Sequence, residues 1–154
     1  MNSGSIYTHI QNNIATIEFF HPASNSFPSS LLKELTTTIE TLGHNPEVGV
    51  VVLKSQGTAT FCAGASFDEL LAVTTEAEGK TFFSGFAHLI NAMRKCPKII
   101  VGRVQGKAVG GGVGIAAACD YVLATQEANI KLSELAIGIG PFVIEPAVSR
   151  KIGK

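Results

Sequence analysis

Residues 105–120 read QGKAVGGGVGIAAACD, and this stretch decides how the rest of the chain is interpreted. Three glycines, Gly110 to Gly112, and then Gly114 stand directly before an alanine-rich segment at 115–118. Each glycine inside a helix costs about 0.5–1 kcal/mol relative to alanine, so a simple turn does not account for so many. The pattern predicts a turn where the backbone approaches another group closely and the first amides of a helix point outward.

Nucleotide-binding motifs fit this glycine run poorly. A GxGxxG dinucleotide fingerprint needs a glycine where the chain has Ile115. A P-loop needs one more residue between Gly102 and Gly106, and a Ser or Thr in place of Ala108. Two interpretations remain: an anion site at a helix N-terminus, favoured by free amides and the helix dipole, or close helix–strand packing.

A second segment of small residues, TATFCAGAS at 58–66, also follows a predicted buried strand and runs through Gly64 into a predicted helix. Its small side chains leave space around the backbone N–H groups. One amide rarely makes an oxyanion hole, whereas two converging amides do. The alternative for this segment is an ordinary turn built from small residues.

A third segment, NIKLSELAIGIGP at 129–141, places Glu134 among apolar neighbours. Glutamate is usually exposed. Here the neighbouring side chains are apolar, so we expect the carboxyl group to be partly buried. A helix-capping role just after Ser133 is the alternative. Three phenylalanines in the middle of the chain, Phe82, Phe83 and Phe86, are assigned to the core or to an interface.

Composition excludes several classes of function. The chain has 154 residues, 45% hydrophobic and 16% charged, which predicts a packed core in one domain or a part of one. Twelve Lys and Arg balance twelve Asp and Glu without a basic block, which argues against nucleic-acid binding. No apolar run approaches the ~20 residues that span a membrane, and the N-terminus does not read as a signal peptide. We therefore expect a soluble, cytoplasmic protein.

The cysteines and histidines do not predict a metal site. Cys62, Cys96 and Cys119 form no CxxC pair, and their odd number argues against a disulfide framework. The histidines show no HExxH spacing.

Hydrophobic periodicity predicts an α/β protein in which strand, loop and helix recur. The expected strands are 6–10 and 14–19, which form a hairpin, and 48–53, 99–104, 121–124 and 129–132. The expected helices follow Pro28 as far as Gly43, fill 67–94 as one or two helices closed by Pro97, and begin again after the glycine run.

Taken together, these segments resemble the crotonase family, also called the enoyl-CoA hydratase/isomerase family. The resemblance is carried by HPASNSF at 21–27, VGVVVLKSQGTATFCAGA at 48–65 and RVQGKAVGGGVGIAAACDYVLA at 103–124. It implies a spiral of ββα units that binds an acyl-CoA thioester, with coenzyme A entering as part of the substrate and no separate cofactor. Residues 1–154 would form the N-terminal core domain of that fold, truncated before the C-terminal helical region of the family.

The resemblance also implies roles for individual residues. The backbone amides of Ala65 and Gly111 match the oxyanion-hole positions, and Glu134 matches the second of two catalytic glutamates. Further substrate contacts fall on the neighbouring positions Cys62, Ala63, Gly64, Gly110 and Gly112.

Two positions depart from the family pattern. The first glutamate falls at Gly114, which weakens a two-glutamate hydratase assignment. It does not exclude hydration, because GGGVG together with KLSELAIGIGP resembles the methylglutaconyl-CoA hydratase branch. Ser66 stands where many members have Asp, so we expect no acid contribution from it.

The sequence leaves three functions open: an enoyl-CoA hydratase, an enoyl-CoA isomerase, and a non-catalytic CoA-binding protein of the same fold. The family resemblance implies a homotrimer or a dimer of trimers. Without the terminal helices we expect weaker association, with apolar surface exposed around 82–90.

Overall fold

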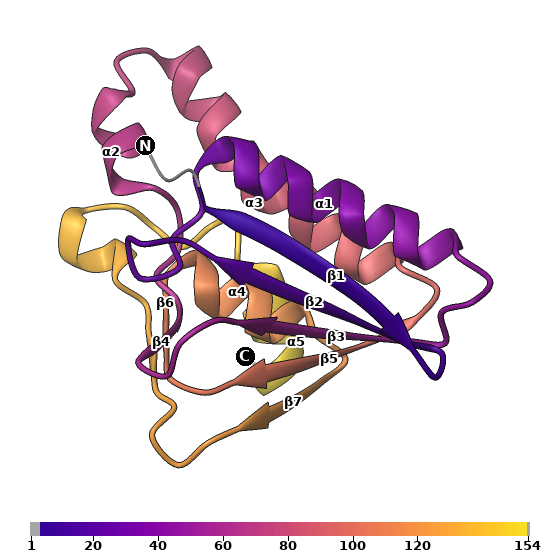
Figure 1. Ribbon diagram of the computed structural model, residues 1–154. Helices are drawn as coiled ribbons and strands as arrows, with labels where there is room; N and C mark the ends of the chain where they lie inside the picture. Colours follow the sequence, from indigo (N-terminus) through magenta and orange to yellow (C-terminus); the bar gives the residue numbers. More distant parts are fainter. Residues whose placement is uncertain (1–3, 154) are drawn as a thin grey trace.

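A five-stranded sheet forms the larger layer of the fold (Figure 1). The structure, a computed structural model, describes residues 4–153. Strands β1 (Ser5–Gln11) and β2 (Ile14–Phe20) form the predicted hairpin. Its turn residues, Asn12 and Asn13, have φ of 52° and 62°, the positive values that a two-residue type I′ turn requires.

The remaining strands of this sheet run parallel to β2. They are β3 (Val50–Ser55), β5 (Ile99–Val104) and β7 (Tyr121–Ala124), and the strand order is β1-β2-β3-β5-β7. The predicted strand 48–53 is thus shifted by two residues. The predictions for 99–104 and 121–124 are confirmed.

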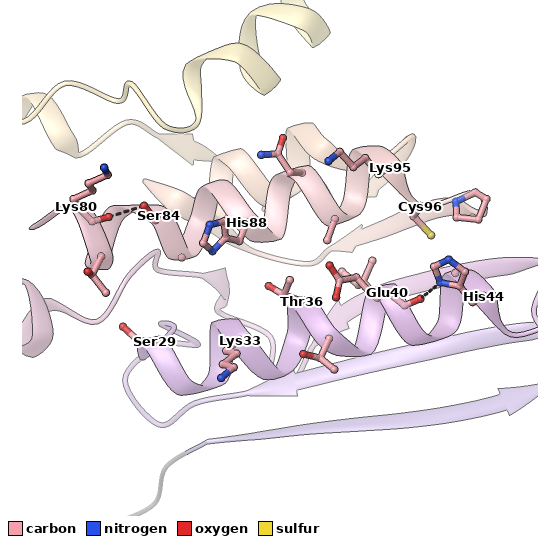
Figure 2. A pocket seen from close by; sticks show the side chains of 18 residues that line it. Ser29, Lys33, Thr36, Glu40, His44, Lys80, Ser84, His88, Lys95 and Cys96 are labelled. Atoms are coloured by element: carbon pink, nitrogen blue, oxygen red, sulfur yellow. Dashed lines mark hydrogen bonds between the residues drawn. The ribbon is translucent and has the colours of Figure 1, made fainter. Parts of the chain in front are cut away.

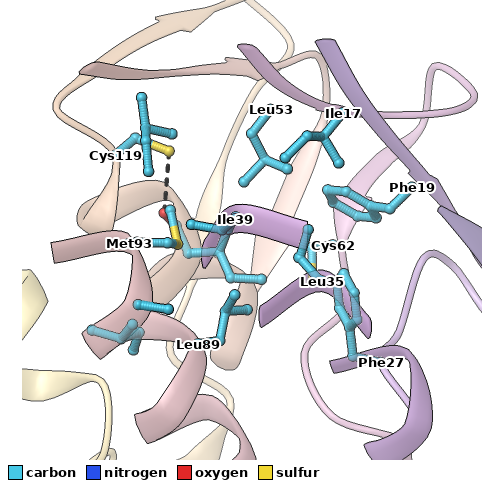
Figure 3. Packing of buried hydrophobic residues seen from close by; sticks show 14 of the residues in the cluster. Ile17, Phe19, Phe27, Leu35, Ile39, Leu53, Cys62, Leu89, Met93 and Cys119 are labelled. Carbon is cyan, nitrogen blue, oxygen red and sulfur yellow. Dashed lines mark hydrogen bonds between the residues drawn. The ribbon is translucent and has the colours of Figure 1, made fainter. Parts of the chain in front are cut away.

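Two long helices, α1 (Ser29–His44) and α3 (Glu76–Lys95), lie side by side and cover one face of the sheet (Figure 1). Alternate side chains of the strands point toward them, as the two-residue period of a strand dictates. Figure 3 shows the resulting core, in which strand residues meet helix residues. Among those labelled are Ile17, Phe19, Leu53, Leu35, Ile39, Leu89 and Met93.

A second sheet holds three short parallel strands, β4 (Thr60–Cys62), β6 (Lys107–Val109) and β8 (Ile130–Lys131), in the order β4-β6-β8. Each of them leads toward a helical segment. These are α2 (Phe67–Ala72), α4 (Gly111–Ala118) and the 3₁₀ helix η1 (Glu134–Ile137), and α5 (Glu145–Ile152) follows. Because parallel strands end at the same edge of a sheet, the three predicted segments meet there.

Several predicted elements differ from the structure. Strands β4 and β6 lie in segments predicted as loops, and the strand expected at 129–132 belongs to the second sheet. Gly43 lies inside α1 rather than just after its end. A Cβ on Gly43 would lie 3.2 Å from Pro97 Cδ and 3.3 Å from Cys96 Sγ. Tight packing against the end of α3 therefore explains this glycine.

The exposed apolar surface agrees with the prediction only in part. Phe83 is 37% exposed, but Phe86, Leu89 and Ile90 on the same helix are buried against the core. More strongly exposed apolar side chains lie elsewhere, for example Leu135 at 70% and Phe142 at 83%. No helix in the described part of the chain has the length and apolarity to cross a membrane.

Candidate active site

A cavity of about 180 Å³ opens where the three strands of the small sheet end. It is lined by the segments that follow β4, β6 and β8, and by aromatic side chains of α3. Six predicted site residues are in its wall: Ala63, Gly64, Ala65, Gly110, Gly111 and Glu134. The fold therefore brings together three segments that lie far apart in the sequence.

The backbone N–H of Ala65 has no hydrogen-bond acceptor among the described residues, because the bridge to Phe27 uses the Gly64 carbonyl and the Ser66 N–H instead. Phe27 N–H donates to the Gly64 carbonyl at 2.8 Å, and Ser66 N–H donates to the Phe27 carbonyl at 3.0 Å. In this parallel bridge between Phe27 and Ala65, the N–H of Ala65 itself points away from Phe27. No acceptor among residues 4–153 receives it, so the amide is available to a ligand in the cavity.

The Gly111 amide is free because it is the first residue of α4, whose opening N–H groups lack partners inside the helix. It likewise donates to no acceptor in the described part of the chain. Gly110 before it has φ 54° and ψ −120°, a backbone conformation that glycine adopts readily. A Cβ on Gly64 would lie 3.1 Å from Gly111 N, so the two segments are in direct contact.

Glu134 is half-buried, as predicted from its apolar neighbours. Its Oε2 atom is buried and has no hydrogen-bond partner among the described residues. The alternative capping role is not observed, because the Glu134 carboxylate forms no hydrogen bond with a backbone N–H of η1 or of any other described residue. Since a buried polar atom without a partner is costly, this carboxylate is oriented for something that enters the cavity.

Gly114 has no room for the glutamate that the family pattern places there. A Cβ at this position would lie 2.5 Å from Ile144 Cγ2 and 3.3 Å from Ile90 Cδ1. Ile144 also lines the cavity. The wall at this point is therefore apolar, and the space that an acid would need is occupied.

Cys62 and Gly112 lie behind the cavity wall, so their positions give no support to the predicted substrate contacts. Cys62 is fully buried, and burial raises the pKa of its thiol to about 12. A Cβ on Gly112 would lie 2.3 Å from the Cys62 carbonyl oxygen. We assign both residues to the packing of α4 against β4.

The other acidic side chains near the site are hydrogen-bonded to other groups or exposed to solvent. Glu69 accepts hydrogen bonds from the Ser29 N–H at 3.0 Å and from its hydroxyl at 2.5 Å. Asp68 is exposed, and Glu145 is bonded to the Ser149 hydroxyl. Ser66 caps α2 by accepting from Glu69 N–H at 3.3 Å, which agrees with the expectation that it is not an acid.

The aromatic wall was missed by sequence reasoning. Phe82, Phe83 and Phe86 line the cavity, although they were assigned to the core or an interface. A Cβ on Gly111 would lie 2.4 Å from the Phe86 ring, so the ring lies across that residue. The only sequence signal was the spacing of the phenylalanines on one helix, which is equally typical of a core.

A larger hollow of about 1160 Å³ lies in the crease between α1 and α3 (Figure 2). Its lysines, Lys33, Lys80 and Lys95, are spread along the two helices rather than gathered at one point. None of the predicted site residues lines it. No cluster of three His, Cys, Asp or Glu side chains suited to a metal ion occurs within residues 4–153.

Comparison with known proteins identifies the relatives of this chain. The model of a family described as enoyl-CoA hydratase/isomerase matches residues 9–154. The short-chain-enoyl-CoA hydratase of Clostridium acetobutylicum is 29% identical over 155 residues, which cover 99% of this chain and 59% of that protein. The methylglutaconyl-CoA hydratase of Rattus norvegicus is 31% identical over 117 residues, 76% of this chain and 37% of that protein.

Solved structures match almost the whole chain. The enoyl-CoA hydratase of Mycobacterium smegmatis superposes with a TM-score of 0.91 at 26% identity, over 97% of this chain and 58% of that one. The chain spans about half the length of the curated relatives it matches.

Proposed function

We propose that this chain, which belongs to the enoyl-CoA hydratase/isomerase (crotonase) family, hydrates an α,β-unsaturated acyl-CoA thioester. One observation carries the proposal: two free backbone amides and one unpartnered carboxylate line the same small cavity. The proposed reaction needs no resident cofactor, because coenzyme A is part of the substrate.

The amides of Ala65 and Gly111 act on the thioester oxygen. Water adds to C3, and the electron pair of the C2–C3 double bond moves toward the thioester, so negative charge develops on that oxygen. Preorganised donors stabilise such charge, and losing one costs about 2.7–4 kcal/mol in a protease example. The apolar wall around the amides strengthens their effect, because it excludes water from the hydrogen bonds.

Glu134 handles the proton. Its carboxylate accepts a proton from the attacking water as the new C3–O bond forms. The same proton is then given to C2 as the enolate collapses to the 3-hydroxyacyl thioester. The water molecule is fully accounted for: its hydroxyl stands on C3, its remaining proton is on C2, and Glu134 returns to its starting state.

An isomerase is the second candidate, and the single cavity-lining acid favours it. One carboxylate suffices to move a proton between C2 and C4 of an enoyl thioester. Glu134 is the only acidic side chain among the described residues that line the cavity. The third possibility, a CoA-binding protein without activity, predicts ligand binding with no change in the acyl group.

We further propose a short, branched acyl group, since relatives at about 30% identity include methylglutaconyl-CoA hydratases. The small volume of the cavity and its apolar lining support this.

The test is an assay of the enoyl-thioester absorbance band with crotonyl-CoA and methylglutaconyl-CoA. Hydration removes the conjugated band and yields a 3-hydroxyacyl-CoA that chromatography identifies. Movement of the double bond to a non-conjugated position would instead identify the isomerase. An unchanged acyl group, with binding of the thioester confirmed by calorimetry, would identify the non-catalytic protein.

A further inference from the structure

The water in the proposed reaction needs two hydrogen-bonding partners, and Glu134 supplies only one. An attacking water is oriented when both of its protons are engaged, because a lone pair then points at the carbon. Position 114 cannot provide the second partner, since it is a glycine with Ile144 and Ile90 packed over it. The second partner must therefore come from another part of the wall.

Ser133 is the other polar side chain in this cavity. Among the described residues that line it, only Ser133 and Glu134 have polar side chains. The rest of the wall is glycine, alanine, proline, larger aliphatic residues and phenylalanine. Any further hydrogen bond to water must come from Ser133 or from the backbone.

The Ser133 hydroxyl is not used elsewhere. Ser133 occupies the N-cap position of η1, where a serine usually accepts a hydrogen bond from the helix backbone. No such bond is present here. No hydrogen bond joins Ser133 Oγ to the Glu134 carboxylate or to any other group within residues 4–153, although the Ser133 carbonyl oxygen accepts one from Ala136 N–H at 3.1 Å. A serine at a capping position that does not cap has its hydroxyl free for a ligand.

The two oxygens converge on the space beside Gly110. The point that a Cβ of Gly110 would occupy lies 3.2 Å from Glu134 Oε1 and 3.4 Å from Ser133 Oγ. Both oxygens thus face Gly110 from the same side. Gly110 directly precedes the Gly111 amide, so a water hydrogen-bonded to both oxygens would lie near the thioester site. Only glycine leaves this space open, which gives Gly110 a role beyond its backbone conformation.

We propose that Ser133 is a catalytic residue that holds the attacking water together with Glu134, in place of the missing glutamate at position 114. This rests on the proposed hydratase function. Glu134 Oε accepts one water proton in a hydrogen bond and removes it. Ser133 Oγ accepts the other in a hydrogen bond that lasts through the addition. Ser133 gains and loses no proton, so the reaction balance is unchanged.

The test separates hydration from proton transfer in one protein. Hydration needs the water, the amides and Glu134. Exchange of the C2 proton of butyryl-CoA with D₂O needs only the amides and Glu134. We expect Ser133→Ala to lower kcat for hydration about tenfold, the effect of one lost hydrogen bond, with little change in KM. Its rate of C2 exchange should stay within about twofold of the unmodified protein.

Two variants serve as controls. Ser133→Thr keeps the hydroxyl and should retain most of the hydration rate. Ser30→Ala removes an exposed serine at the start of α1, outside the cavity, and should change neither rate.

The outcomes distinguish the two claims. An unmodified protein that exchanges C2 protons but does not hydrate would sink the hydratase proposal, and the role of Ser133 with it. A hydrating protein in which Ser133→Ala keeps the full rate would overturn the role of Ser133 alone. Equal losses of hydration and exchange in Ser133→Ala would also overturn it, because they would mean a structural role.

Discussion

Glu134 is the residue on which proton transfer depends in this account. Glu134→Gln keeps the size and a hydrogen-bonding end but removes the base. General acid–base catalysis contributes about 10²–10⁴-fold, so kcat for hydration should fall by about that factor. Affinity for a saturated acyl-CoA, measured by calorimetry, should change little.

Glu145→Gln is the matched control, since that glutamate lies outside the cavity and is bonded to Ser149. Full activity of Glu134→Gln on the best substrate would show that another group carries the proton. Asp68 and Glu69 would then be tested next.

Glu134 also illustrates what the sequence can predict about a single residue. Its apolar neighbours predict partial burial, which the structure confirms. The unpartnered state of Oε2 is not visible in the sequence, because it depends on residues from three separate segments. For the same reason the blocking of position 114 by Ile144 was unpredictable: thirty residues of chain separate the two.

The contact between α4 and β4 is the element-scale feature that sets the Gly111 amide in place. A methyl group at Gly112 would lie 2.3 Å from the Cys62 carbonyl oxygen. Because this oxygen belongs to the backbone, no change of side-chain rotamer can relieve the clash. Overpacking of this kind costs about 1–3 kcal/mol, so Gly112→Ala should lower the free energy of unfolding by that amount. Urea titration followed by circular dichroism measures the change.

Gly49→Ala is the control for this substitution, because its Cβ would lie 3.6 Å from the nearest atom, Asn13 O, an ordinary contact. If the two variants unfold at the same urea concentration, the close packing of α4 on β4 does not exist as described.

The loop between β2 and α1 positions segment 58–66, which carries the Ala65 amide. Asn25 is buried there, and its Nδ2 donates to the carbonyls of Gln56 and Thr60, each at 2.9 Å. Its Oδ1 accepts from His21 N–H at 3.0 Å. Two residues further on, Phe27 forms the bridge that orients Ala65. Asn25 therefore ties the loop to β4 just before the bridge.

Asn25→Ala should lower the free energy of unfolding by about 3 kcal/mol, because it leaves buried backbone groups without partners. Thermal or urea unfolding checks this value. Asn129→Ala, at an exposed asparagine, should change stability little. A loss below about 1 kcal/mol for Asn25→Ala would contradict the role of this side chain as a brace.

Element prediction succeeded where the hydrophobic pattern was clear. The hairpin, α1 and the strands at 99–104 and 121–124 follow from apolar runs or helical spacing, and the strand predicted at 129–132 corresponds to the two-residue β8. Strands β4 and β6 have three residues each and were missed, because the pairing of the small sheet is set by tertiary contacts rather than by local pattern. The sequence could therefore identify the segments of the site without showing the sheet that joins them.

At the scale of the whole molecule, the resemblance is confirmed: the family match covers residues 9–154 and the solved structures superpose closely. The assembly, the location in the cell and the acyl specificity stay predictions.

The three cysteines provide a probe of the whole fold. Cys62 and Cys119 are buried, and burial raises the pKa of each thiol to about 12, whereas Cys96 is half-buried. Thiolates are the reactive form. At pH 8 an aromatic disulfide reagent should therefore modify Cys96 first, and the other two only as the protein unfolds.

The liberated chromophore counts the reacted thiols over time. Cys96→Ser should remove the fast phase and leave the slow one. Rapid reaction of a second thiol in the native protein would mean that the core around Cys62 or Cys119 is open.

The central claim is that the amides of Ala65 and Gly111 polarise the carbonyl of a bound CoA thioester. Infrared difference spectroscopy of butyryl-CoA labelled with ¹³C at the carbonyl tests it directly. The account predicts that the carbonyl stretch moves to lower frequency on binding, and that it does so equally in Glu134→Gln, where both amides remain. A carbonyl band that stays at its solution frequency, with binding confirmed by calorimetry, would contradict the account.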